Sequence, residues 1–411
     1  MIVVETVREN IPVSHREIVI LGSTGSIGTQ AIDVVERNSD RLRVVGVGAA
    51  GSNPMLLAEQ ALALDVDVIA VTKSSAAQDV QLALYAAAER RGYTKGEFRI
   101  PKLLAGPGAM SELAAWPCDV VLNGMTGSIG LEPTLAALRA GHTLALANKE
   151  SLIAGGPLVR EVAEPDQITP VDSEHSALAQ CLTGGRREEV SRLVLTATGG
   201  PFRGRARDEL TAVTVAEALR HPTWSMGPVV TINSATMVNK SLEVIEAHEL
   251  FGVSYDDIAV MLHPQSYIHS MVEFRDGATI AQISPPDMRL PIAQSLVWPD
   301  RLPDVAPPVD WTTAHTWQLY PMDDEAFPAV ELAKSAGRAG GCLPAVFNAA
   351  NEECVAAFMD ERLPFLGIVD TVSEVMERAP EFGTPGTVDD VLAAEDWART
   401  AARDRIAKEA R

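Results

Sequence analysis

The chain has 411 residues, too many for one hydrophobic core, and its formal net charge of −21 opposes binding to phosphate-rich surfaces. Hydrophobic residues make up 46% and charged residues 22%, a globular balance that excludes collagen-like structure and extensive disorder. We therefore expect two or three domains, no nucleic-acid partner and no membrane partner.

The beginning of the chain and the cysteines bear on the compartment. Residues 1–16 carry charged side chains and lack the apolar core of a signal peptide, and no later apolar run reaches membrane-spanning length. The four cysteines show no C-x-x-C pair and no zinc-site spacing, so we expect buried free thiols. These features predict a cytoplasmic protein in which residues 1–16 form an N-terminal extension.

Residues 17–167 alternate short β-rich apolar runs with helical stretches, the pattern of βαβ units around a parallel sheet. This pattern predicts an α/β first domain, with helices at about 27–38, 54–64, 76–91 and 132–140. The expected strands are Ile18–Leu21, Leu42–Val47, Val68–Val71, Val120–Asn123 and Thr143–Ala147.

A glycine-rich turn, Gly22-Ser-Thr-Gly-Ser-Ile-Gly28, directly follows the first of these strands. Glycines at such positions let the chain turn tightly, approach a pyrophosphate and pack a helix on the sheet. An ordinary strand-to-helix turn is the alternative. The position after the first strand favours a dinucleotide site of the Rossmann type.

The end of the second strand bears on the choice between NAD and NADP. NAD-selective folds usually place Asp or Glu there, whereas this chain reads Gly48-Ala-Ala-Gly-Ser-Asn53. The missing carboxylate permits the 2′-phosphate of NADP, to which Ser52 and Asn53 can donate hydrogen bonds. No Arg or Lys stands beside them, and a plain loop is the alternative.

A second segment begins near Ile168, where a strand-like run leads into Asp172 and Glu174. Two residues apart in an extended chain, these carboxylates point to one side, an arrangement that suits a hard divalent cation. A solvated loop is the alternative.

A predicted helix at Val238–Phe251 carries Lys240 and Glu243 on one face, because they are three residues apart. A surface ion pair is the alternative to a functional site. If this helix converges with the two earlier carboxylates, Mg²⁺ or Mn²⁺ is held by Asp172, Glu174 and Glu243. A phosphate group a few ångströms away is then held by Ser234, Asn239 and Lys240.

Two loops and a hairpin follow from local composition. Thr198-Gly-Gly-Pro201 ends another strand and offers a hydroxyl and amides to a phosphate, or is a simple turn. His221-Pro-Thr-Trp-Ser-Met-Gly227 has the composition of a lid that closes over substrate, or of a buried packing loop. An Asp-Gly turn predicts a hairpin of Tyr267–Phe274 and Ala278–Ile283.

Taken in order, these segments resemble the 1-deoxy-D-xylulose 5-phosphate reductoisomerase family from about Glu17 to Phe358. The blocks that carry the resemblance are Gly22 to Gly28, Asn148-Lys-Glu150, Asp172-Ser-Glu-His175, Gly199-Gly-Pro-Phe202, His221-Pro-Thr-Trp224, Asn233-Ser-Ala-Thr-Met237, Asn239-Lys240, His263-Pro-Gln-Ser266 and Asn348-Ala-Ala-Asn-Glu352.

The resemblance implies a homodimer and an α/β fold with an N-terminal Rossmann-type parallel sheet, a central α/β catalytic domain and a C-terminal helical domain. The limits expected for this chain are 1–16 for the extension, 17–167 for the NADPH-binding domain, 168–297 for the catalytic and dimerisation domain, 298–324 for a proline-rich connecting arm and 325–411 for the helical domain. The implied reaction rearranges 1-deoxy-D-xylulose 5-phosphate and reduces it with NADPH to 2-C-methyl-D-erythritol 4-phosphate, in isoprenoid biosynthesis.

The resemblance also implies roles residue by residue. The cofactor site is implied to contain Thr24, Gly25, Ser26, Ile27, Gly51, Ser52, Asn53, Asn148, Glu150 and Gly227. The metal is implied to bind Asp172, Glu174 and Glu243. The substrate, a small phosphorylated sugar, is implied to contact Lys149, Ser173, Glu174, Thr198, His221, Ser234, Asn239, Lys240 and Glu243. The catalytic roles are implied for Lys149, Glu174, His221 and Trp224.

Three positions depart from the family pattern. Thr198 stands where serine is usual and keeps the hydroxyl, and Ser241 replaces a common glycine within the predicted helix. Ser52 stands where some members have lysine, which puts the strength of the preference for NADPH in doubt. Two other functions stay open: an NADP-dependent dehydrogenase without rearrangement, and a non-catalytic NADP-binding regulator.

Overall fold

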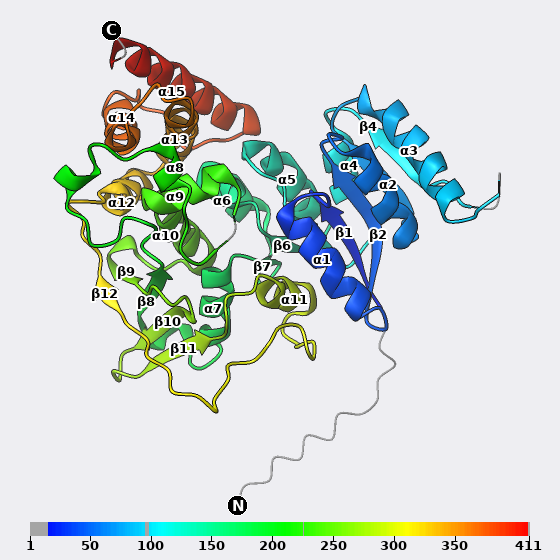
Figure 1. Ribbon diagram of the computed structural model, residues 1–411, viewed down its shortest axis with the longest axis horizontal. Coiled ribbons are helices and arrows are strands. Elements are labelled where there is room, and N and C mark those ends of the chain that lie inside the picture. Colours follow the sequence, from blue (N-terminus) through cyan, green and yellow to red (C-terminus); the bar gives the residue numbers. More distant parts are fainter. Residues whose placement is uncertain (1–14, 95–97, 225, 410–411) are drawn as a thin grey trace, which may run out of the picture.

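The structure is a computed structural model that describes residues 15–94, 98–224 and 226–409 (Figure 1). Seven parallel strands form the first sheet, in the order β4-β3-β2-β1-β5-β6-β7. They are β1 (Arg16–Leu21), β2 (Leu42–Ala49), β3 (Val68–Val71), β4 (Lys102–Ala105), β5 (Val120–Asn123), β6 (Thr143–Leu146) and β7 (Ile168–Pro170). The predicted Rossmann-type sheet is confirmed, and the loops that follow its strands meet at one edge.

Helices cover both faces of this sheet. One face packs in a common core with α1 (Ser26–Arg37), α2 (Pro54–Ala63) and α3 (Ala76–Arg90). The other face packs in a larger core with α4 (Ala109–Ala114), α5 (Leu131–Arg139) and α6 (Lys149–Val162). Helix α1 shows the sequence basis of this packing, because Ala31, Val34 and Val35 recur at helical spacing and are all buried.

Two strands of the first sheet differ from expectation. Strand β4 is not predicted, because it is a four-residue edge strand in which only Leu104 is buried. Strand β7 pairs with β6 and so ends the first sheet, although the sequence places it at the start of the second segment. The domain limits themselves stay a prediction.

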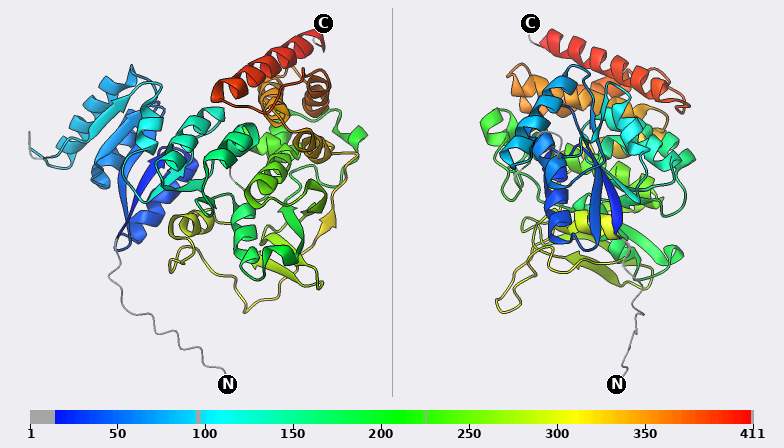
Figure 2. Two further views of the ribbon diagram at one scale, coloured as in Figure 1. Left: turned by 180° about the vertical axis from the view of Figure 1, so that it is seen from behind. Right: turned by 90° about the vertical axis from the view of Figure 1, so that its right-hand side faces the viewer.

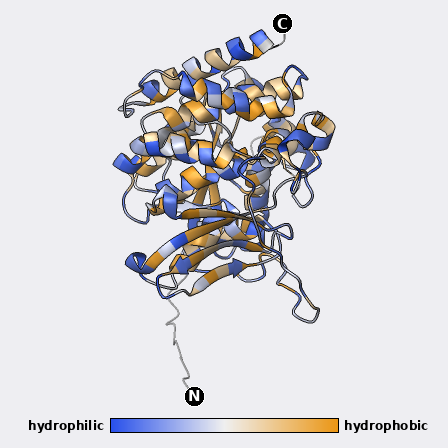
Figure 3. Ribbon diagram, turned by 90° about the vertical axis from the view of Figure 1, so that its left-hand side faces the viewer, coloured by the Kyte–Doolittle hydropathy of each residue, from blue (hydrophilic) through white to orange (hydrophobic). Residues whose placement is uncertain are grey.

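The second sheet has five strands in the order β11-β10-β8-β9-β12. They are β8 (Val190–Ala197), β9 (Ile258–Leu262), β10 (Ile268–Phe274), β11 (Thr279–Ile283) and β12 (Tyr320–Pro321). Strands β10 and β11 are antiparallel and confirm the predicted hairpin, whereas β8 and β9 run parallel. Figure 3 shows hydrophobic residues, in orange, along much of these strands.

The helices of the central part are α7 (Ser173–Leu182), α8 (Val215–Ala218), α9 (Pro228–Ala235) and α10 (Val238–Phe251). The next helix, α11 (Arg289–Val297), packs against α1 and strands β6 and β7 of the first sheet. Short 3-10 turns occur at η1 (Ser128–Gly130), η2 (Arg187–Glu189), η3 (Arg207–Leu210) and η4 (Tyr255–Asp257). After α11 an extended segment, drawn in yellow, crosses to β12 along the outer side of the molecule (Figure 1).

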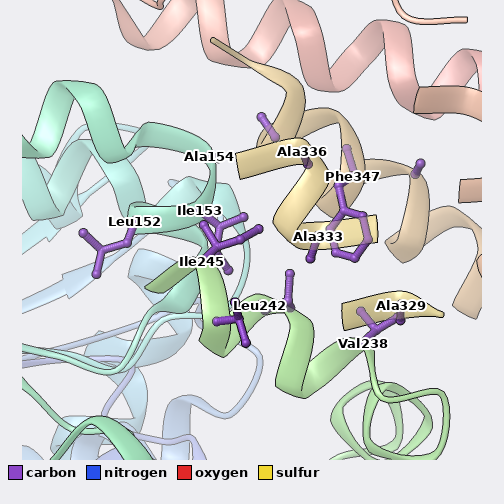
Figure 4. Close-up of a cluster of buried hydrophobic side chains, with 14 of the residues drawn as sticks. Leu152, Ile153, Ala154, Val238, Leu242, Ile245, Ala329, Ala333, Ala336 and Phe347 are labelled. Atoms are coloured by element: carbon purple, nitrogen blue, oxygen red, sulfur yellow. The ribbon is translucent and has the colours of Figure 1, made fainter. Parts of the chain in front are cut away.

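The C-terminal part consists of α12 (Ala329–Ala339), α13 (Leu343–Met359), α14 (Phe365–Glu377) and α15 (Val388–Glu409), which confirms the predicted helical region. These helices, in orange and red, lie against the central part, while the first sheet lies at its side (Figure 2). Figure 4 shows how one apolar cluster joins the three regions through Ile153 of α6, Ile245 of α10, Ala333 of α12 and Phe347 of α13. Within the described residues no helix is long and apolar enough to span a bilayer.

Candidate active site

The glycine-rich turn has no room for a side chain at two of its glycines. Gly22 has φ +83°, and a Cβ there would lie 2.6 Å from the carbonyl oxygen of Gly124. A Cβ on Gly28 would lie 2.4 Å from the carbonyl oxygen of Gly22. The turn leads into α1, whose first turn carries no acidic side chain. These features fit a pyrophosphate at the start of α1.

The loop after β2 lies next to the glycine-rich turn, because β2 and β1 are neighbouring strands. Gly51 has φ +87°, and a Cβ there would lie 2.6 Å from the Cβ of Ala76. Asn53 caps α2, because its Oδ1 accepts a hydrogen bond from the amide of Leu56 at 3.1 Å. Ser52 and Asn53 are exposed, so both side chains remain accessible to a ligand at this edge.

Asn148 joins the loop after β5 to the start of α6. Its Oδ1 accepts from the amide of Ser151 at 3.0 Å, and its Nδ2 donates to the carbonyl oxygens of Met125 at 3.1 Å and Gly127 at 3.0 Å. Glu150 accepts from the amide of Gly127 at 3.0 Å, and burial raises the pKa of this carboxyl. The two side chains therefore hold the loop in place next to the glycine-rich turn.

The three carboxylates expected to bind metal converge. Asp172 caps α7, Glu174 lies in its first turn, and Glu243 projects from α10. One oxygen from each lies within 4.8 Å of the others. All three donors are oxygen atoms, and the set therefore fits Mg²⁺ or Mn²⁺ by the chemistry of its ligands.

Two lysines neutralise this cluster. Lys149 Nζ contacts Asp172 and lies 2.8 Å from Glu243 Oε1. Lys240 Nζ lies 2.8 Å from Glu174 Oε1 and also contacts Glu243. Lys240 and Glu243 are only 4% and 1% exposed, so the alternative of a surface ion pair is wrong.

Burial and neighbouring charges shift the pKa values in opposite directions. Burial raises the pKa of Glu174 to about 8, and the nearby Glu243 carboxylate adds to the effect. Burial also opposes ionisation of Asp172, but the Lys149 ammonium holds the pKa of that carboxyl well below its usual range. One site therefore holds a carboxyl that protonates easily beside one that stays ionised.

Sequence reasoning missed a further buried carboxylate next to the three that converge. Glu246 lies one turn after Glu243 on α10, is 1% exposed, and has an oxygen 3.3 Å from His175 Nδ1. His175 Nε2 lies 2.9 Å from the backbone oxygen of Glu243. Burial raises the pKa of Glu246 to about 7. The i, i+3 spacing of the two glutamates was the available signal.

The expected phosphate donors lie around a tight loop. A Cβ on Gly200 would lie 2.9 Å from the backbone oxygen of Ser234, so the loop after β8 packs directly on the end of α9. Thr198 Oγ1 lies 3.0 Å from His221 Nε2. The amide of Trp224 donates to His221 Nδ1 at 2.8 Å, which places the proton of a neutral imidazole on Nε2. Burial lowers the pKa of His221 and favours this neutral form.

The remaining candidates lie at the rim of this region. Ser173 Oγ donates to Glu174 Oε2 at 2.5 Å, and Asn239 Nδ2 donates to Glu243 Oε1. Trp224 Nε1 donates to Ser266 Oγ at 3.1 Å. Gly227 precedes α9 in an extended conformation, and Ser225, within the expected lid, lies outside the described residues.

Profiles of one protein family match most of the chain. The profile of 1-deoxy-D-xylulose 5-phosphate reductoisomerase matches residues 18–156, that of its C-terminal domain residues 168–251, and that of a DXP reductoisomerase C-terminal domain residues 283–401. The enzyme of that name from Kitasatospora griseola is 63% identical over 95% of the chain and 100% of its own length. The Streptomyces coelicolor enzyme is 59% identical over 96% of the chain and 94% of its own length.

Solved structures of the same enzyme share the whole fold. The Zymomonas mobilis enzyme in complex with NADPH aligns with a TM-score of 0.87 and 38% identity, covering 96% of the chain and 99% of its own. A DOX-P reductoisomerase in complex with NADPH, fosmidomycin and magnesium aligns with a TM-score of 0.83 and 31% identity, covering 95% of the chain and 98% of its own.

Proposed function

We propose residue roles for this chain on the premise that it belongs to the 1-deoxy-D-xylulose 5-phosphate reductoisomerase family. It is an NADP-dependent oxidoreductase that converts 1-deoxy-D-xylulose 5-phosphate to 2-C-methyl-D-erythritol 4-phosphate with NADPH and a divalent metal, a reaction of isoprenoid biosynthesis. The observation that best supports the roles is the convergence of three carboxylates and two lysines, with Asp172 and Glu174 following β7 of the sheet whose β1 leads into the dinucleotide turn.

Asp172, Glu174 and Glu243 hold the metal in this proposal. When bound, Mg²⁺ or Mn²⁺ polarises the ketone and hydroxyl oxygens of the substrate and eases the rearrangement of the carbon skeleton. The two lysines, which otherwise neutralise the carboxylates, then bind substrate oxygens. Lys149 contacts the backbone of the sugar and Lys240 its phosphate.

The other substrate contacts divide between the two ends of the sugar. Ser173 binds the carbon backbone, beside the carboxylate of Glu174. The phosphate end is bound by Thr198, His221, Ser234, Asn239 and Lys240. His221 donates from Nε2, and Trp224 on the lid excludes water from the reacting carbons.

The cofactor lies along the carboxyl edge of the first sheet in this proposal. The pyrophosphate binds the amides of the glycine-rich turn, and the adenosine ribose lies at the loop after β2. Asn148 and Glu150 hold the loop after β5 on the nicotinamide side. The full cofactor set comprises Thr24, Gly25, Ser26, Ile27, Gly51, Ser52, Asn53, Asn148, Glu150 and Gly227.

We also propose a homodimer formed by the second sheet and the 298–324 arm. Trp317 stacks on Tyr267 and on His315, with centroid distances of 6.0 and 5.7 Å, and Trp311, which is 69% exposed, meets His315 edge to face. Trp311 and His315 are exposed, and aromatic side chains gathered at the surface in this way are typical of an interface. A cytoplasmic location and the domain limits given above are also part of the proposal.

The decisive assay follows NADPH oxidation by purified protein with Mn²⁺ and 1-deoxy-D-xylulose 5-phosphate. Oxidation should stop on chelation and return with Mn²⁺. Glu243→Gln should lose at least about 100-fold in kcat/KM, whereas Glu249→Gln, on the same helix but paired with Arg160, should keep it. Full activity of Glu243→Gln, or activity that survives chelation, would refute the assigned metal site.

A further inference from the structure

The loops at the carboxyl edge of the first sheet are almost free of charge. In the described structure the strands β1 to β6 are followed by residues 22–25, 50–53, 72–75, 106–108, 124–127 and 147–148. The only charged side chain in these loops is Lys73, after β3. A dianionic phosphate group bound at the adenosine end of this edge can therefore pair with only one positively charged side chain of these loops, Lys73.

Lys73 lies directly beside the loop that carries Ser52. Strands β2 and β3 pair through Ala49 and Val71, and the amide of Thr72 donates to the carbonyl oxygen of Ala49 at 3.4 Å. Thr72 Oγ1 also donates to the carbonyl oxygen of Ala50 at 3.5 Å. The two loops are thus hydrogen-bonded to each other immediately before Lys73.

Gly51 packs against two residues that flank Lys73 in the sequence. A Cβ built on Gly51 would lie 2.6 Å from the Cβ of Ala76 and 3.8 Å from Cγ1 of Val71. Lys73 is two residues after one contact and three residues before the other. The flexible four-carbon side chain of Lys73 is long enough to carry its ammonium group past these neighbours.

Lys73 is available to a ligand. It is exposed, and within the described residues it forms no ion pair. The other polar side chains of these two loops, Ser52, Asn53, Thr72, Ser74 and Ser75, are all neutral. No carboxylate of either loop competes for the ammonium group.

We propose that Lys73 binds the 2′-phosphate of NADPH and sets the preference for NADPH over NADH. The inference rests on the proposed placement of the adenosine ribose at the loop after β2. No Lys or Arg stands next to Ser52 in the sequence. Lys73 supplies this missing positive charge from the loop after the neighbouring strand. A charge-assisted hydrogen bond to the phosphate forms only with the phosphorylated cofactor.

The test measures dissociation constants of NADPH and NADH by fluorescence titration, without substrate or metal. Lys73→Met should weaken NADPH binding about tenfold, equivalent to about 1.4 kcal/mol, and leave NADH binding within about twofold. Lys73→Arg should restore NADPH binding. Lys102→Met is the matched control, because Lys102 is also exposed but lies at the amino end of β4 and pairs with Glu112.

The outcomes separate this inference from the proposed function. Equal NADPH affinity of Lys73→Met and the wild type would overturn the role of Lys73 alone. Equal weakening of NADPH and NADH would also overturn it, since the effect would not depend on the 2′-phosphate. A wild-type protein that binds neither dinucleotide would instead overturn the proposed cofactor site.

Discussion

Replacing Lys240 by methionine removes one of the two ammonium groups that neutralise the carboxylate cluster. Its Nζ lies 2.8 Å from Glu174 Oε1 and also contacts Glu243, in a side chain that is 4% exposed. Removing one partner of a buried ion pair costs about 3–5 kcal/mol. Protonation of Glu174, whose pKa burial raises to about 8, relieves part of this cost. We expect the metal-free protein to lose about 3 kcal/mol in its free energy of unfolding.

The same substitution should strengthen metal binding while it abolishes turnover. In the metal-free protein Lys240 occupies oxygens of Glu174 and Glu243 that a divalent cation needs. Without this competitor the dissociation constant for Mn²⁺ should fall about tenfold, or about 1.4 kcal/mol. NADPH oxidation should nevertheless be lost, because the substrate phosphate loses its cation.

Thermal unfolding in chelator and in excess Mn²⁺, together with calorimetric Mn²⁺ titration, measures both effects. The destabilisation by Lys240→Met should be large in chelator and small with Mn²⁺. Lys102→Met is a control with an effect of about 0–1 kcal/mol, because its pair with Glu112 is exposed. Equal destabilisation in both conditions, with unchanged Mn²⁺ affinity, would refute competition between Lys240 and the metal.

Three further predictions concern other parts of the molecule. Gly28→Ala places a Cβ 2.4 Å from the carbonyl oxygen of Gly22. This substitution should abolish NADPH binding in a fluorescence titration, while Mn²⁺ binding persists. Retained NADPH affinity would contradict the assignment of the glycine-rich turn to the cofactor site. Because burial lowers the pKa of His221 below 6.5, the unfolded chain binds its proton more readily, so stability should fall as pH drops below 6.5. Denaturant unfolding of the wild type and His221→Asn checks this, and identical pH dependence would refute it. Trp311→Asp should shift the sedimentation coefficient from dimer to monomer, and an unchanged dimer would exclude this aromatic surface as the interface.

Local patterns in the sequence were enough for five strands of the first sheet and for its glycine-rich turn. The strand at Ile18–Leu21 is a continuous apolar run, and the spacing of the glycines after it is a local motif, so both can be predicted without tertiary contacts. The same local reasoning failed for β4, whose four residues are half exposed at a sheet edge. It also could not tell which sheet β7 joins, because pairing is decided by the partner strand.

The active site depended on contacts that no local pattern contains. Asp172 and Glu174 form a recognisable pair in sequence, but Glu243 follows about 70 residues later and meets them only because α10 packs beside α7. The packing of α6 and α7 against α10 brings Lys149 and Lys240 among the carboxylates and sets opposite pKa shifts for Asp172 and Glu174. The sequence by itself determined which groups are present and on which elements they lie. The tertiary structure decided which charges are buried together, because burial and electrostatic coupling depend on distance in space rather than along the chain.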